Sequence, residues 1–224
     1  MRAYDREDMG IDRAGWPFII GALVVALALG WWFGRLWAVP FVVLAGFFVF
    51  FFRDPDRQVP AGPNLVVSPA DGRVMIVGAP GAGAPPGSWQ QISIFLSPMD
   101  VHVNRAPVDA VVTRVEYHPG RFLPAYREDA GQFNEWTEVA FDHNGQPIVC
   151  RQIVGILARR IVTRLEAGQR VSRGERFGIM KFGSRIDLFL PTAAQLAVKV
   201  GDRVVGGEST LAMLPTEPAA TATR

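Results

Sequence analysis

The sequence predicts a mainly β domain preceded by an N-terminal hydrophobic helical hairpin. Three observations support this prediction: two apolar runs near the N-terminus, many short Val- and Ile-rich segments after them, and a glycine-bounded repeat near the C-terminus. Of the 224 residues, 49% are hydrophobic and 20% are charged, which is enough apolar material for a folded core. The length suits one good-sized domain with appendages.

Residues 1–57 are predicted to form a membrane anchor. Two uncharged apolar runs, 16–33 and 36–52, are separated by Gly34 and Arg35. A spanning helix needs about 20 apolar residues, and about 17 is the lower limit, so both runs are short for spans. They are interpreted either as a hairpin of two spans or as a bent pair inserted in one leaflet. A soluble core helix would be amphipathic, and a signal peptide would not be followed at once by a second apolar run.

The basic residues around these runs predict the orientation of the anchor. Arg35 is the only basic residue between the runs, and five arginines flank their outer ends, namely Arg2, Arg6, Arg13, Arg53 and Arg57. In a hairpin, this asymmetry places both ends on the cytoplasmic side of the membrane. We therefore expect an inner-membrane protein with its soluble part in the cytoplasm.

Residues 58–215 have the pattern of a β-rich domain. No segment in it has the long apolar periodicity of a helix. Residues 126–133 suit a short helix or a loop. Residues 216–224 are expected to be a disordered tail. The predicted strands are short, Val- and Ile-rich and bounded by Gly and Pro: 65–67, 73–77, 91–96, 110–117, 138–141, 148–156, 160–164, 176–181, 186–190, 195–198 and 209–214.

An internal repeat lies within this domain. GQRVSRGE at 168–175 recurs as GDRVVGGE at 201–208. A glycine, a short Val-containing strand and a second glycine predict a turn–strand–turn corner. Biotinyl/lipoyl carrier domains and related hybrid barrels use such corners in pairs, so the repeat favours a compact β-sandwich or hybrid barrel of that kind. Two unrelated surface turns would give the same pattern.

Composition excludes some kinds of site and partner. The net charge of +2 argues against a nucleic-acid binder, which usually has a strong basic excess. The single cysteine, Cys150, cannot form an internal disulfide. Three scattered histidines provide no cluster with metal-ligand spacing, so we expect no metal site.

Two polar motifs hold candidate proton-transfer residues. SPADGRV, at 68–74, places Asp71 just before a strand, where a simple turn is the alternative. FLSPMDVHVNRAP, at 95–107, is a strand followed by a polar elbow that contains His102. Histidine is the side chain best suited to move protons near neutral pH, although a lone histidine is often structural.

A third motif holds a candidate nucleophile. KFGSRIDLFLP, at 181–191, places Gly183 and Ser184 between two apolar segments. Glycine permits a strained backbone, and the next hydroxyl can attack the glycine carbonyl, so this peptide bond could break itself. The alternative is a hairpin turn.

In this order, the three motifs resemble the phosphatidylserine decarboxylase family in its short, bacterial and archaeal-type form. The resemblance covers most of residues 50–214 and includes RDPDR at 53–57 and YHPGRF at 117–122. Family members are proenzymes in which the serine of a Gly-Ser motif becomes a pyruvoyl group during self-cleavage. The resemblance implies that this motif is Gly183–Ser184.

The resemblance also implies roles for individual residues. Ser184 would attack the Gly183 carbonyl, which yields a β chain (1–183) and an α chain (184–224) that stay together as a heterodimer. His102 would be the general base and acid, and Asp71 would orient it. Larger members have a second histidine three residues after the first and a threonine after the serine, where this chain has Arg105 and Arg185. One histidine would therefore serve both reactions, or another group takes one of them.

The implied activity is pyruvoyl-dependent decarboxylation of phosphatidylserine to phosphatidylethanolamine and CO₂. The pyruvoyl group derived from Ser184 would accept the electrons left by CO₂, so no metal or external cofactor is expected. The expected partners are a phospholipid substrate and the membrane. Two alternatives remain: a decarboxylase of an archaetidylserine-type lipid, and a non-enzymatic membrane-anchored hybrid-barrel adaptor, which would stay uncleaved.

Overall fold

A computed structural model describes residues 10–81, 83–127, 129–156, 161–181 and 183–216. The chain divides into two compact units, the first ending at Asp56 and the second beginning at Arg57. The predictions for Arg2, Arg6, Phe182 and residues 217–224 lie outside the described residues.

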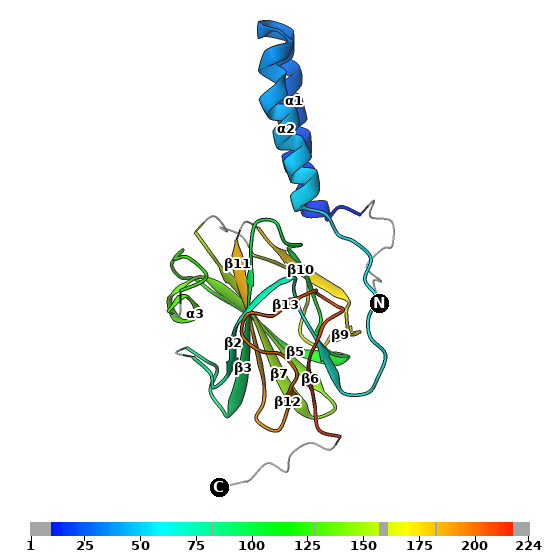
Figure 1. Ribbon diagram of the computed structural model, residues 1–224, viewed down its shortest axis with the longest axis vertical. Coiled ribbons are helices and arrows are strands. Elements are labelled where there is room, and N and C mark those ends of the chain that lie inside the picture. Colours follow the sequence, from blue (N-terminus) through cyan, green and yellow to red (C-terminus); the bar gives the residue numbers. More distant parts are fainter. Residues whose placement is uncertain (1–9, 82, 128, 157–160, 182, 217–224) are drawn as a thin grey trace. The chain divides into compact units, whose positions relative to one another are not determined.

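The first unit is a pair of antiparallel apolar helices (Figure 1). Its elements are a 3₁₀ turn η1 (Arg13–Gly15), α1 (Trp16–Phe33) and α2 (Arg35–Phe51). The helices are joined at Gly34, whose φ of 96° is favourable only for glycine. The start of α1 packs on the end of α2, because the Phe18 ring lies 5.5 Å from that of Phe48 and 5.4 Å from that of Phe52. The hairpin predicted from the two apolar runs is therefore confirmed.

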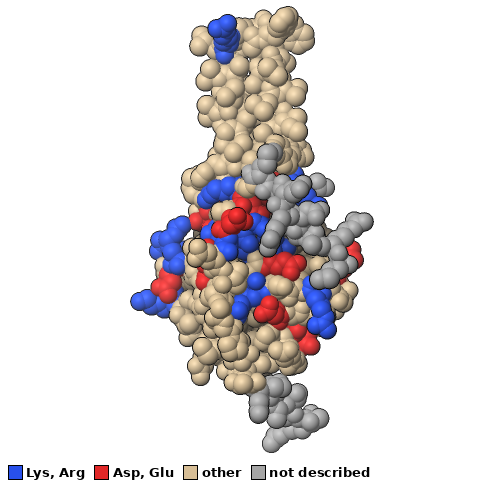
Figure 2. All heavy atoms as spheres, turned by 90° about the vertical axis from the view of Figure 1, so that its right-hand side faces the viewer, with Lys and Arg blue, Asp and Glu red and all other residues tan. Residues whose placement is uncertain are grey.

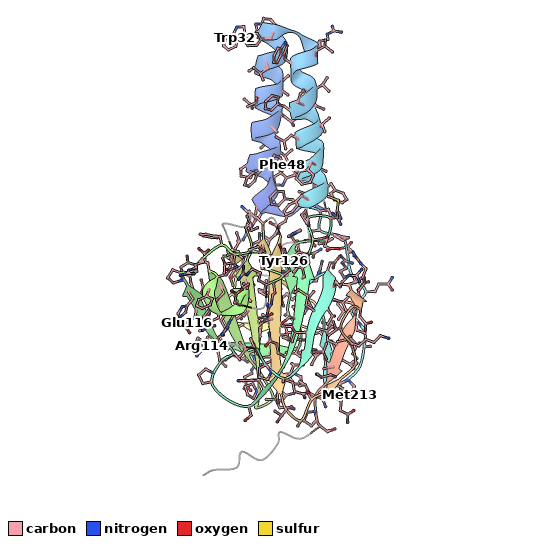
Figure 3. All side chains as sticks on the ribbon, turned by 60° about the vertical axis from the view of Figure 1, so that its left-hand side comes forward. Trp32, Phe48, Arg114, Glu116, Tyr126 and Met213 are labelled. Carbon is pink, nitrogen blue, oxygen red and sulfur yellow. The ribbon has the colours of Figure 1, made fainter. Side chains whose placement is uncertain are left out.

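The outer surface of this helical pair is apolar. Trp31, Trp32 and Leu36 are at least three-quarters exposed, and Arg35 supplies the only Lys or Arg side chain on the two helices (Figures 2 and 3). The segment Arg13–Phe33 is long and apolar enough to cross a membrane, by length and composition, whereas Arg35–Phe51 is shorter. An apolar helix pair exposed in this way suits a lipid environment better than water.

The second unit is built from antiparallel strands in three sheets. An eight-stranded sheet has the order β13-β2-β3-β11-β7-β6-β5-β9, and two three-stranded sheets have the orders β1-β14-β12 and β4-β10-β8. Its elements are β1 (Leu65–Val67), β2 (Gly72–Gly78), β3 (Trp89–Leu96), β4 (Val103–Arg105), β5 (Ala110–His118), α3 (Ala130–Phe133), β6 (Trp136–His143), β7 (Gln146–Val154), β8 (Ile161–Thr163), β9 (Arg170–Val171), β10 (Arg176–Met180), β11 (Ser184–Pro191), β12 (Gln195–Leu196), β13 (Arg203–Val204) and β14 (Thr210–Met213).

Strand β11 lies inside the large sheet, paired with β3 and β7 along most of its length. One face carries Ile186, Leu188 and Leu190 into the hydrophobic core. The opposite face carries Arg185 and Asp187, which are also buried. The prediction of a mainly β fold is confirmed, and the relation to biotinyl/lipoyl-like folds stays a prediction.

The two copies of the repeat form the two edges of the large sheet. Strand β9 pairs with β5 at one edge, and β13 pairs with β2 at the other. The glycines that bound the repeats have left-handed φ angles at matching positions, 87° at Gly168 and 96° at Gly201, then 79° at Gly174 and 80° at Gly207. The predicted turn–strand–turn corners are therefore confirmed.

Some predicted boundaries were wrong. The polar elbow at 103–105 is strand β4, because its backbone pairs with β10 despite its polar side chains. Strand β7 ends at Val154 rather than at residue 156. The short helix suggested within 126–133 is present as Ala130–Phe133.

Candidate active site

Ser184 is the first residue of β11, at one end of the large sheet. It lies between Leu96, the last residue of β3, and Val154, the last residue of β7. Its side chain is fully buried, and its Oγ has no hydrogen-bond partner among the described residues. A buried hydroxyl without a hydrogen-bond partner lowers the stability of the fold. Its presence at this position therefore suggests a chemical role.

Gly183 has the left-handed φ of 67°, which supports the prediction that glycine is needed here. The preceding strand β10 ends at Met180 and belongs to a different sheet from β11. The Gly-Ser bond therefore lies in a crossover between two sheets. The alternative of a simple hairpin turn is wrong, because β10 and β11 do not pair.

Gly155 lies against the carbonyl group that Ser184 would attack. A methyl group placed on Gly155 would lie 2.3 Å from the Gly183 oxygen and 3.2 Å from the Gly183 carbonyl carbon. The same methyl position is 3.4 Å from the Ala125 Cβ. Only glycine therefore lets the backbone after β7 approach the Gly183 carbonyl this closely.

Asn134 clamps the surrounding segments. Its buried amide donates to the Val154 carbonyl at 2.9 Å and to the Leu123 carbonyl at 2.8 Å, and its Oδ1 accepts from the Leu123 N–H at 2.9 Å. The end of β7 and the 121–125 segment are thus held together beside Gly183. Sequence reasoning missed both Gly155 and Asn134, because the contacts that give them a role join segments distant in sequence.

A closed turn after β3 positions His102. Ser97 donates to the Asp100 carboxylate from its backbone N–H at 2.8 Å and from its hydroxyl at 2.7 Å. Arg203 adds a 2.7 Å ion pair to the same carboxylate. The Asp100 backbone carbonyl is then 2.9 Å from His102 Nδ1. Since a carbonyl can only accept, this contact favours the tautomer with the proton on Nδ1 and an accepting Nε2.

His102 and Ser184 are connected through the strands on either side. The Met180 N–H, four residues before Ser184, donates to the His102 carbonyl at 3.2 Å. On the other side, His102 follows the loop that leaves β3 at Leu96, the neighbour of Ser184. Both side chains are fully buried.

The structure does not place Asp71 in hydrogen-bond contact with His102. The Asp71 carboxylate accepts from Arg57 at 2.9 and 3.1 Å and from the Gly206 N–H at 2.7 Å. These contacts tie the turn before β2 to the turn after β13. The orienting contact on His102 comes instead from Asp100, which the Ser-x-x-Asp spacing of SPMD could have indicated.

Arg105 is buried at the end of β4. Its guanidinium donates to the Gly174 carbonyl at 3.1 Å. Nearby, Gln152 donates to the Asn104 Oδ1 at 2.6 Å and accepts from the Thr163 hydroxyl at 2.6 Å. This polar network links β4 and β8 to β7. Gln152 lies two residues before Val154, the β7 neighbour of Ser184.

A buried ion pair fixes the chain immediately after Ser184. Arg185 and Asp187 are each about 2% exposed, and they form two hydrogen bonds of 2.6 and 2.8 Å. Arg185 also donates to the Arg127 carbonyl at 3.2 Å and to the Ser93 hydroxyl at 3.3 Å. The pair therefore holds the first residues of β11 in place independently of the bond to Gly183.

Replacing Asp187 with asparagine is expected to lower the free energy of unfolding by about 3–5 kcal/mol, because Arg185 would keep a buried, uncompensated charge. Urea unfolding of the detergent-solubilised chain measures this change. The double variant Arg185→Met with Asp187→Leu is the control and should recover most of the loss. If Asp187→Asn lowers the free energy of unfolding by only about 0–1 kcal/mol, as for an exposed ion pair, this account is contradicted.

Comparison with known proteins shows the family of the chain. A model of the phosphatidylserine decarboxylase family matches residues 44–212, most of the chain. A phosphatidylserine decarboxylase proenzyme of Nitrosomonas europaea is 41% identical over 206 residues, covering 90% of this chain and 94% of the relative. Those of Cupriavidus taiwanensis and Solibacter usitatus are 39% and 40% identical, covering 91% of this chain and 95% and 97% of the relatives.

These matches define the class of the protein as a decarboxylase made as a proenzyme. The chain belongs to the phosphatidylserine decarboxylase family. This finding does not favour the alternative of a non-enzymatic adaptor.

Proposed function

We propose that Ser184 cuts the chain at Gly183 and becomes a pyruvoyl group, and that the processed enzyme decarboxylates phosphatidylserine. The observation that carries this proposal is the buried Ser184 hydroxyl, which has no hydrogen-bond partner among the described residues and follows a glycine with left-handed φ. The relatives are phosphatidylserine decarboxylase proenzymes, which supports the same substrate here.

Self-cleavage proceeds through the residues of the Gly-Ser bond. His102 accepts the Ser184 Oγ proton while Oγ attacks the Gly183 carbonyl carbon. The C–N bond breaks, the Ser184 nitrogen gains a proton, and an ester joins the two chains. Removal of the Ser184 α-proton then breaks the Cβ–O bond and releases Gly183 as a carboxylate. The dehydroalanine that remains exchanges its nitrogen for a water oxygen and releases ammonia.

The Asp100 carbonyl orients the His102 ring for this step. Its 2.9 Å contact places a proton on Nδ1, so the neutral form of the ring accepts at Nε2. Asp100 is itself held by Ser97 and Arg203, so the ring is oriented by a braced turn. We assign Asp71 to bracing Arg57 and Gly206 rather than to orienting His102.

The pyruvoyl group at the start of the α chain supplies a carbonyl that accepts the electron pair left by CO₂. The Ser184 position suits such a group, because it is buried and because Val154, the neighbour of Ser184 on β7, is held by Asn134. The Arg185–Asp187 pair keeps this new chain end in place after the cut. His102 returns a proton to the carbon that has lost CO₂. The α and β chains stay paired through β11, which lies between β3 and β7.

The apolar hairpin supports a membrane location for the enzyme. Residues 1–57 anchor the chain, and the arginines at their outer ends favour the cytoplasmic side of the inner membrane for residues 58–215. A phospholipid substrate would then be available in the same bilayer. Decarboxylation is tested directly by the release of labelled CO₂ from carboxyl-labelled phosphatidylserine. An archaetidylserine-type lipid is the comparison substrate.

Replacing His102 with glutamine is expected to slow self-cleavage by at least about 100-fold, since the amide cannot accept the Ser184 proton as a base. The fraction of cut chain is followed by denaturing gel electrophoresis over time. His143→Gln is a matched control, because His143 also contacts a backbone carbonyl through Nδ1, at 2.6 Å, but lies at the far end of β6. Normal cleavage of the His102 variant would assign the base to another group.

A further inference from the structure

Strand register brings several loops together at the Ser184 end of the large sheet. Strand β3 ends at Leu96, and β7 ends at Val154, both beside Ser184. On the adjoining strands, β5 ends and β6 begins where His118 pairs with Trp136. The segments 97–102, 119–135 and 155–156 therefore all leave the sheet at this end.

Exposed apolar side chains gather on these segments. Nine large hydrophobic residues of the described part of the second unit are exposed, and six of them lie at the Ser184 end. We call these six the Ser184 rim: Met99, Tyr117, Phe122, Tyr126, Phe133 and Ile156. The other three are Val59, Val200 and Met213. Figure 3 shows Tyr126 and Met213 at opposite ends of this unit.

The rim has the chemistry of a bilayer interface. Tyr126 is 61% exposed, and its ring packs on the Phe95 ring in a T-shaped contact with the ring centroids 6.2 Å apart. Arg121 lies over the Phe133 ring at 5.5 Å, whereas Arg127 on the same segment is ion-paired with Asp129 at 2.8 Å. Aromatic rings with polar tips and arginines with apolar stems are suited to the headgroup layer, and Arg121 suits anionic lipids.

We propose that the Ser184 rim is a membrane-contact surface that seats this end of the catalytic unit in the headgroup layer of an anionic bilayer. This inference rests on the proposed function, because a lipid must bring its headgroup to the buried Ser184. The surface acts in addition to the apolar hairpin. The hairpin keeps the chain at the membrane, and the rim selects the end of the sheet that meets the lipid.

The first test locates the rim in a bilayer with the full chain. Tyr126→Cys and Met213→Cys are each labelled with an environment-sensitive fluorophore and reconstituted in phosphatidylcholine–phosphatidylglycerol vesicles that contain brominated lipid. The native Cys150 does not interfere, because burial raises the pKa of its thiol and shields it from reagent. We expect loss of fluorescence and a blue shift for the label at position 126, and neither at position 213.

The second test separates lipid access from chemistry. In the Met99→Ser, Tyr126→Ser variant, KM for phosphatidylserine in vesicles should rise about tenfold, because apolar side chains no longer enter the bilayer. Activity on a short-chain, water-soluble phosphatidylserine should not change. Val200→Ser with Met213→Ser is the matched control, and it should leave both activities unchanged.

If the fluorescence of the labels at positions 126 and 213 is the same and neither is quenched, the proposal of a membrane-contact surface is wrong. Cross-linking of two chains through Tyr126→Cys, without quenching, would overturn it in favour of an interface between copies. Failure of the proposed function has a different signature, since the chain would then stay uncut and inactive on both substrates. The fluorescence readout needs no catalysis, so it decides the proposal in that case as well.

Discussion

Replacing Ser184 with alanine is expected to give a chain that stays in one piece and releases no CO₂ from phosphatidylserine. The Ser184 Oγ is the only atom in the proposal that attacks the Gly183 carbonyl, so its removal abolishes both cleavage and pyruvoyl formation. Because Oγ has no hydrogen-bond partner among the described residues, its loss should not lower stability. Gel electrophoresis, a CO₂-release assay and thermal unfolding measure the three consequences.

This combination separates a chemical role from a structural one. A structural serine would lose hydrogen bonds and melt at a lower temperature when replaced. Ser209→Ala is the control, because the Ser209 hydroxyl accepts from the Val205 N–H at 2.9 Å and its removal should affect stability but not cleavage. Residual decarboxylation by an uncut Ser184→Ala chain would overturn the role of Ser184.

Replacing Gly155 with alanine is expected to slow self-cleavage by about 100-fold or more. The added methyl group would lie 2.3 Å from the Gly183 oxygen, so the carbonyl must move from its place beside Ser184. A displacement of about 1 Å at a reacting group can cost about 100-fold in rate. The cut fraction over time measures the effect, and Gly155 lies just beyond β7, so the sheet itself should still form.

Two further measurements show which step the methyl group blocks. Hydroxylamine cleaves esters much faster than amides, so it should cut a wild-type precursor that has formed the ester but leave the Gly155→Ala chain intact. Gly81→Ala is the matched control, since a methyl group there has ordinary contact, 3.7 Å from the Gln91 side chain. Wild-type cleavage of the Gly155 variant would show that the Gly183 carbonyl need not stay where the structure places it.

The sequence was most informative where a local pattern decides the structure. The apolar runs predicted the helical hairpin, and the paired glycines of the repeat predicted the corners around β9 and β13. The positive φ at Gly183 likewise agrees with a role that only glycine fills easily. Each of these features depends on residues adjacent in the chain.

The contacts around Ser184 could not be predicted because they join distant segments. Asn134 hydrogen-bonds to the backbone of Leu123 and Val154, and the Gly155 backbone lies close to the Gly183 carbonyl. No periodic pattern in the sequence indicates these contacts. Asp71 was chosen as the partner of His102 by resemblance, whereas its carboxylate is used by Arg57 and Gly206. The contact from Asp100 to His102 joins residues two apart, so the local Ser-x-x-Asp spacing could have indicated it.

The most direct test of the central claim is the intact mass of the purified full chain under denaturing conditions. We predict two chains, residues 1–183 with a free Gly183 carboxylate, and residues 184–224 lighter than a serine-started chain by one ammonia. The Ser184→Ala chain, measured in parallel, should remain whole. A single chain of 24.6 kDa that persists on long incubation would contradict self-cleavage at Gly183–Ser184 and the pyruvoyl chemistry that depends on it.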